Sequence, residues 1–155
     1  MGALLLTAVV AVGAVGLSGQ DPALDRTAAI RWGLRRAAHV AGIGAVGAGV
    51  LLVLAALSVL EAPGGGELSV GYAVRNSAGL AGLAAGAAAV WGGRHAWMAP
   101  FGWCLAAFFV PSSEGLPARI ATWLLQPADT AAATWTSVVL TVGGGLLYAL
   151  AGSRR

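Results

Sequence analysis

The sequence predicts an all-α integral membrane protein, built as a bundle of about five transmembrane helices with a short amphipathic helix on the inner surface. Two features of composition predict this class. Of the 155 residues, 58% are hydrophobic and only 10% are charged, and the mean hydropathy is +0.81. A soluble domain carries about 25% charged residues, whereas a lipid bilayer accepts an apolar exterior. We therefore expect the lipid bilayer to be the principal partner of this chain.

The basic residues provide the third observation. All nine are arginine, and they give a net charge of +3. A basic balance can indicate nucleic-acid binding, but these arginines lie mainly between apolar runs, where they orient a membrane protein. We therefore expect no nucleic-acid partner.

Five apolar runs are expected to form the spans, at residues 3–17, 40–60, 70–91, 96–110 and 131–151. A spanning helix needs about 17–25 residues, so the first and fourth runs are short. The first run can also be read as a signal peptide. Against that interpretation, no Arg or Lys precedes it, and no small-x-small cleavage pattern follows it. A four-span alternative without the first run keeps the orientation of the others.

Two segments between the runs are expected to lie along the membrane surface. Residues 22–38 place Ile30, Leu34 and Ala37 at helical spacing beside arginines, which is typical of an amphipathic helix on the inner surface. Residues 111–130 contain three prolines and form an outer segment. Within it, residues 118–126 are expected to lie as an interfacial helix, because Trp123 suits the headgroup depth.

Charge placement predicts the orientation of the bundle. With the N-terminus outside, the inner side receives Arg26, Arg31, Arg35, Arg36, Arg94, Arg154 and Arg155, and the outer side receives Arg119. Such an excess of arginine on one side is the positive-inside pattern. We therefore expect a multi-pass plasma-membrane protein with its N-terminus outside and its C-terminus in the cytoplasm.

Small residues indicate how the helices pack. The third run contains a GxxxG motif at Gly82 and Gly86. Because lipid is as apolar as leucine, helices in a membrane associate through close approach, which small residues permit. The motif favours packing within one bundle, and the alternative is a face that forms a homo- or hetero-oligomer.

One arginine falls inside an expected span. Arg75 lies several residues from the outer end of the third run and is followed by Asn76. An arginine at the end of a span can extend its head to the interface, whereas a central one is costly and usually functional. The first interpretation is an interfacial anchor. The second is a polar site inside the bundle formed by Arg75, Asn76 and Glu67, with the guanidinium facing the bundle or the outer headgroups.

The sequence predicts neither an enzyme nor a cofactor site. Without lysine there is no Walker-type nucleotide motif, and no hydrolase or zinc-protease motif occurs. His39 and His95 lack a cysteine or carboxylate cluster at metal-ligand spacing. No span contains an Asp or Glu in its interior, which a proton- or sodium-coupled carrier would use.

Several short patterns carry a resemblance to a known class of proteins. They are Asp21-Pro22-Ala23-Leu24-Asp25-Arg26, Arg35-Arg36-x-x-His39, Arg75-Asn76-x-x-Gly79-Leu80-x-Gly82-Leu83, Ala96-Trp97-x-x-Pro100 and Tyr148-Ala149-Leu150-x-Gly152-x-Arg154-Arg155. In these patterns the chain resembles small multi-span membrane proteins of actinobacteria, similar to permease-like subunits of ABC exporters. A typical exporter permease has six spans, one more than expected here.

The resemblance implies a membrane component of an ABC-type export system that works with a separate ATPase subunit. The inner segment would then be its docking surface, with Arg31 and Arg35 in contact with the ATPase. The alternative is a structural or interaction membrane protein with no transport role, which the absence of an intramembrane carboxylate favours.

Overall fold

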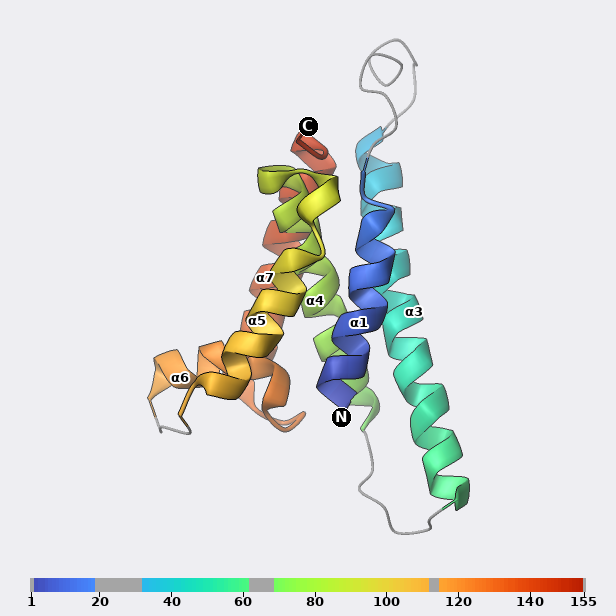
Figure 1. The fold of residues 1–155 in the computed structure, drawn as a ribbon, viewed down its shortest axis with the longest axis vertical. Coiled ribbons are helices and arrows are strands. Elements are labelled where there is room, and N and C mark those ends of the chain that lie inside the picture. Colours follow the sequence, from blue (N-terminus) through green and yellow to red (C-terminus); the bar gives the residue numbers. More distant parts are fainter. Residues whose placement is uncertain (1, 19–31, 62–68, 112–114, 155) are drawn as a thin grey trace.

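The computed structural model describes residues 2–18, 32–61, 69–111 and 115–154. Throughout these residues the secondary structure is helical, with no strand, so the expected all-α class is confirmed. The α-helices are α1 (Gly2–Val15), α3 (Trp32–Glu61), α4 (Val70–Trp91), α5 (Met98–Phe109), α6 (Leu116–Ala121) and α7 (Ala131–Ala151). Two 3-10 turns, η1 (Gly93–His95) and η2 (Trp123–Leu125), complete this part of the chain (Figure 1).

Helix α4 is the centre of the bundle, because α1, α3, α5 and α7 all pack against it. It starts where Ser69 caps it by accepting a hydrogen bond from the Tyr72 amide at 3.1 Å, a common role for serine. It ends at Gly92, whose φ of 94° favours glycine. Between these ends its buried face consists mainly of alanine and glycine, with Arg75, Asn76 and Ser77 as its buried polar residues. Small side chains let four neighbouring helices approach one central helix closely.

Two helices are long and apolar enough to cross a membrane, α3 over Trp32–Leu57 and α7 over Ala131–Ala151. Helices α1 and α5 have 14 and 12 residues, which at about 1.5 Å per residue is well below the ~30 Å hydrocarbon core. The α5 helix is short because the turn after η1 takes residues 96 and 97 of the expected run, and Pro111 follows the end of the helix. A residue before proline avoids the helical conformation, and Val110 is extended at ψ 123°.

Helix α3 runs without a break through the boundary that the sequence analysis places between an inner surface helix and the second span. Residues 32–38 belong to the same 30-residue helix as residues 40–60. No proline interrupts this stretch, and Ala37 and Ala38 favour helix continuation. The remainder of the expected inner helix, residues 22–31, lies outside the described residues.

Helices α1, α3, α4, α5 and α7 alternate in direction along the chain, and the two termini lie at opposite ends of the bundle (Figure 1). Contacts at the C-terminal end join distant segments. The Tyr148 hydroxyl donates to the Leu17 carbonyl at 2.9 Å, and the Arg154 amide donates to the Ala88 carbonyl at 3.1 Å. We call this end the arginine end, because the start of α3, η1 and the segment after α7 meet there and carry four arginines: Arg35, Arg36, Arg94 and Arg154.

Candidate functional site

The most polar feature of the described interior surrounds Arg75 on α4, at the end of the bundle opposite the arginine end. Only 8% of this residue is exposed. Its NH1 donates to the Pro127 carbonyl at 2.6 Å, and its NH2 donates to the carbonyls of Gln126 at 2.7 Å and Trp123 at 3.4 Å. Carbonyl dipoles of residues 123, 126 and 127 therefore surround the guanidinium.

Two neighbours on α4 bind the same segment. The Tyr72 hydroxyl and the Asn76 side-chain amide both donate to the Leu124 carbonyl, at 2.9 and 3.0 Å. The Asn76 side-chain oxygen accepts from Arg75 Nε at 3.0 Å, and the Arg75 guanidinium lies 5.6 Å from the Tyr72 ring centroid. We call Tyr72, Arg75 and Asn76 the polar clamp, since together they hold the carbonyls of residues 123–127.

The polar clamp can reach these carbonyls because η2 packs inside the bundle. Trp123 and Leu124 are fully buried, so the Trp123 ring packs inside the bundle and does not lie on its surface. Gly79 provides the space: a Cβ there would lie 2.8 Å from Trp123 Cζ3 and 2.9 Å from Ser137 Oγ. Ser137 also ties α7 to the clamp by donating to the Arg75 carbonyl at 2.6 Å.

The other residues expected to form the polar site or the docking surface are only partly described. Glu67 and Arg31 lie outside the described residues. Arg35 is exposed at the arginine end, with its guanidinium 5.8 Å from the Trp32 ring centroid. Of the three residues expected in the polar site, the structure therefore brings Arg75 and Asn76 together.

The GxxxG motif faces α7 of the same chain. A Cβ on Gly82 would overlap the Leu140 carbonyl, and a Cβ on Gly86 would lie 3.4 Å from the Gly144 Cα. The contact is close from the other side as well, because a Cβ on Gly144 would overlap the Gly82 carbonyl oxygen. The α4 and α7 backbones therefore meet at Gly82 and Gly144, which makes this the tightest helix pair described.

The clamp suits positioning better than catalysis. None of its three residues is a carboxylate, and the Tyr72 hydroxyl, the Asn76 amide and the two terminal nitrogens of Arg75 all donate to main-chain carbonyls. No group of three or more metal-ligating side chains occurs within the described residues. Sequence reasoning missed Tyr72 and the residue 123–127 carbonyls. The helix-terminating Pro127 indicates unpaired carbonyls just before it, but no pattern indicates which helix binds them.

Comparison with models of protein families, with curated proteins and with solved structures finds no match to this chain.

Proposed function

We propose that the chain is a multi-pass plasma-membrane protein with its N-terminus outside and its C-terminus in the cytoplasm. We propose further that it is the membrane component of an ABC-type export system whose ATPase is a separate subunit. The membrane assignment rests on the surface of the two long apolar helices, the orientation on the arginines, and the export role on the sequence resemblance.

The surface of α3 and α7 is the observation that carries the membrane assignment. Within their most apolar windows only 28% and 17% of residues are buried inside the chain. A core helix of a soluble protein would be mostly buried. Large apolar side chains instead point outward along both helices, as Val53 and Val139 do at 60% and 65% exposed. An outer surface of this kind is stable in lipid and costly in water.

The five-span arrangement with one cytoplasmic end is supported by helix direction and charge. The helices α1, α3, α4, α5 and α7 alternate in direction. Of the six described arginines, all but Arg75 and Arg119 lie at the arginine end. Arginine concentrates on the cytoplasmic side of membrane proteins. The short helices α1 and α5 would cross together with their adjoining turns, in a locally thinned bilayer.

A subunit role is favoured over an independent carrier by the buried polar groups. Among the described residues these are Thr7, Arg75, Asn76, Ser77 and Ser137, with no carboxylate. Each of them makes a hydrogen bond inside the chain. The same observation favours the second candidate, a structural or interaction membrane protein without transport.

Reporter fusions test the membrane assignment and the orientation. Alkaline phosphatase and green fluorescent protein are fused in turn after Ser18, Gly65, Gly93 and Arg155. We expect fluorescence without phosphatase activity at Ser18, Gly93 and Arg155, and phosphatase activity at Gly65. Phosphatase activity at Gly93 or Arg155 would reject the orientation, and recovery of the full chain in the soluble fraction would reject the membrane assignment.

Affinity purification from native membranes separates the two candidate roles. In an export system an ATPase co-purifies, and charge reversal by Arg31→Glu with Arg35→Glu releases it. The matched control is Arg119→Glu, an exposed arginine at the opposite end, which should leave the ATPase bound. If no ATPase co-purifies with the unaltered chain, the non-transport role is favoured.

A further inference from the structure

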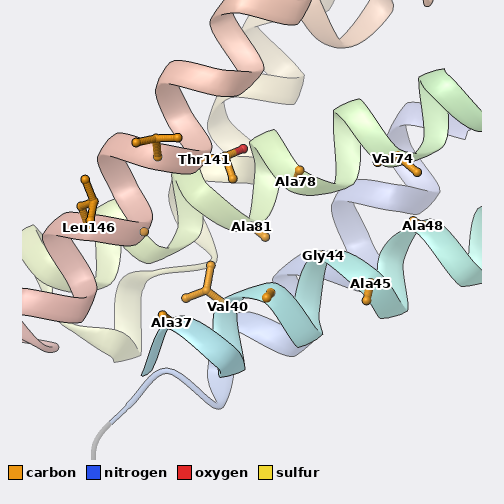
Figure 2. A pocket seen from close by; sticks show the side chains of 13 residues that line it. Ala37, Val40, Gly44, Ala45, Ala48, Val74, Ala78, Ala81, Thr141 and Leu146 are labelled. Carbon is orange, nitrogen blue, oxygen red and sulfur yellow. The ribbon is translucent and has the colours of Figure 1, made fainter. Parts of the chain in front are cut away.

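A groove runs between α3, α4 and α7 on the side of the bundle away from α5 (Figure 2). Its volume is about 680 Å³, within the ~300–1,000 Å³ typical of small-molecule sites. The α3 wall includes Ala41, Gly44 and Ala45, the α4 wall includes Ala78, and the α7 wall includes Thr141 and Leu146. The groove exists because these side chains are too small to fill the space between the three helices.

The groove wall is apolar even at its one hydroxyl group. The Thr141 hydroxyl donates to the Ser137 carbonyl of its own helix at 2.7 Å. The Thr141 hydroxyl therefore has no proton left to donate to a ligand. The rest of the groove wall is hydrocarbon. An alkyl chain meets this requirement.

The length and position of the groove distinguish a lipid chain from a partner helix. Its α3 wall extends from Ala37 to Ala48, which is about 16 Å along the helix axis. That distance matches one leaflet, half of the ~30 Å hydrocarbon core, whereas a spanning partner helix would need the whole thickness. The groove also begins at the arginine end, since Ala37 directly follows Arg36.

Positive charge lies at the mouth of the groove. Arg36 belongs to the same face of α3 as Val40, which lines the groove one helical turn further on. Its guanidinium rests against the end of α7, where a Cβ on Gly152 would lie 2.9 Å from Arg36 Cζ. Arg35 precedes Arg36 in the first turns of α3 and is exposed, with its guanidinium 5.8 Å from the Trp32 ring centroid. Basic pockets between membrane helices on the cytoplasmic side bind anionic lipid headgroups.

We propose that this groove binds one acyl chain of an anionic phospholipid from the inner leaflet, with the lipid phosphate held at Arg35 and Arg36. The inference rests on the membrane assignment and orientation proposed above. The charge complementarity and the one-leaflet length favour the lipid over a second copy of the chain.

Native mass spectrometry of the full chain in detergent tests the site, with dioleoylphosphatidylglycerol and dioleoylphosphatidylcholine added in equal amounts. We expect one phosphatidylglycerol to be retained in preference to phosphatidylcholine. Ala41→Phe and, independently, Ala45→Phe should fill the groove and abolish that preference. Arg35→Gln should weaken phosphatidylglycerol binding about fivefold, the effect of one charge near a membrane surface.

Matched controls carry the same changes away from the groove. Ala56→Phe alters an exposed alanine of α3 that does not line the groove, and Arg119→Gln removes an exposed charge at the other end; both should retain the lipid. Equal retention of the two lipids would overturn the proposal, as would unchanged preference in both phenylalanine variants. A dimer of the unaltered chain that dissociates in these phenylalanine variants would also overturn it.

The two proposals can fail separately. A chain that inserts into the membrane but shows no lipid preference refutes this inference alone, whereas a soluble chain refutes the proposed function.

Discussion

The indole ring of Trp123 occupies the space that a side chain at Gly79 would need, with Trp123 Cζ3 2.8 Å from the position of a Cβ on that glycine. The two residues are far apart in sequence, and their contact fixes how the segment after α6 enters the bundle. Ser137 Oγ of α7 borders the same space, 2.9 Å from the position of that Cβ. Neither a rotation of Trp123 nor a shift of α7 can therefore easily accommodate a larger residue.

Gly79→Ala should consequently destabilise the protein by about 1–3 kcal/mol, the usual cost of an added methyl group in a close-packed interior. The measurement is thermal unfolding in detergent. Gly102→Ala is the matched control, because a Cβ at Gly102 meets nothing within 4 Å, and alanine there should be neutral or stabilising. Equal melting temperatures for the two variants would contradict the packing of Trp123 against α4.

The three consecutive glycines of α7 should differ sharply in their tolerance of alanine. A Cβ on Gly144 overlaps the Gly82 carbonyl oxygen, whereas Cβ atoms on Gly143 and Gly145 meet nothing within 4 Å. Backbone atoms cannot rotate away, so Gly144→Ala should cost about 3 kcal/mol, the upper part of the overpacking range. Gly143→Ala and Gly145→Ala should be neutral or slightly stabilising. Unfolding curves that coincide for all three variants would exclude this α4–α7 contact.

Runs of apolar residues predicted much of the helical architecture, because a helix that faces lipid or other helices needs an apolar surface. The last run, residues 131–151, coincides with α7, and residues 70–91 coincide with α4. The prediction was poorer where tertiary contacts decide. A tryptophan is typical of the interface, but the sequence does not indicate that the Trp123 ring is buried in the space beside Gly79. No local pattern in the sequence indicates that Gly79 and Trp123 are in contact.

The polar site was predicted only in part for a similar reason. An arginine inside an apolar run indicates a need for hydrogen-bond acceptors, and Asn76 beside it supplied one. The other acceptors are main-chain carbonyls of residues 123, 126 and 127. Every residue has a main-chain carbonyl group, so the residue types at these positions do not indicate that their carbonyls bind Arg75.

Helix α1 should behave as a packed element of the bundle. Leu6 is fully buried, while the adjacent Leu5 is 41% exposed, and a Cβ on Gly47 of α3 would lie 3.1 Å from Leu6 Cδ1. Leu6→Ala should therefore cost about 1–3 kcal/mol through the cavity that it leaves, since lipid removes the transfer part of the usual penalty. Leu5→Ala, the matched control, should change the unfolding free energy little. The reverse order of the two variants in thermal unfolding would contradict the packing of α1 against α3.

The polar clamp predicts that Arg75 cannot be replaced by lysine or glutamine without loss of stability. Its guanidinium binds the Pro127 and Gln126 carbonyls and the Asn76 side chain at once, which requires a planar group with several donors. Arg75→Gln should cost about 1.5–3 kcal/mol, the value of a hydrogen-bonded charged group. Arg75→Lys should recover little, because an ammonium group on a flexible stem lacks the fork geometry. Thermal unfolding in detergent measures both variants.

Arg119→Gln removes an exposed arginine from the same end of the bundle and is the matched control; it should leave the melting temperature nearly unchanged. If Arg75→Gln is equally harmless, Arg75 is only an interfacial anchor and the clamp contributes nothing to stability. A double-mutant cycle with Glu67→Gln tests the carboxylate partner expected from the sequence. A coupling energy near zero between positions 75 and 67 would exclude that pairing. The residue 123–127 carbonyls and the nearby Asp129 carboxylate would then remain as the groups that stabilise the Arg75 charge.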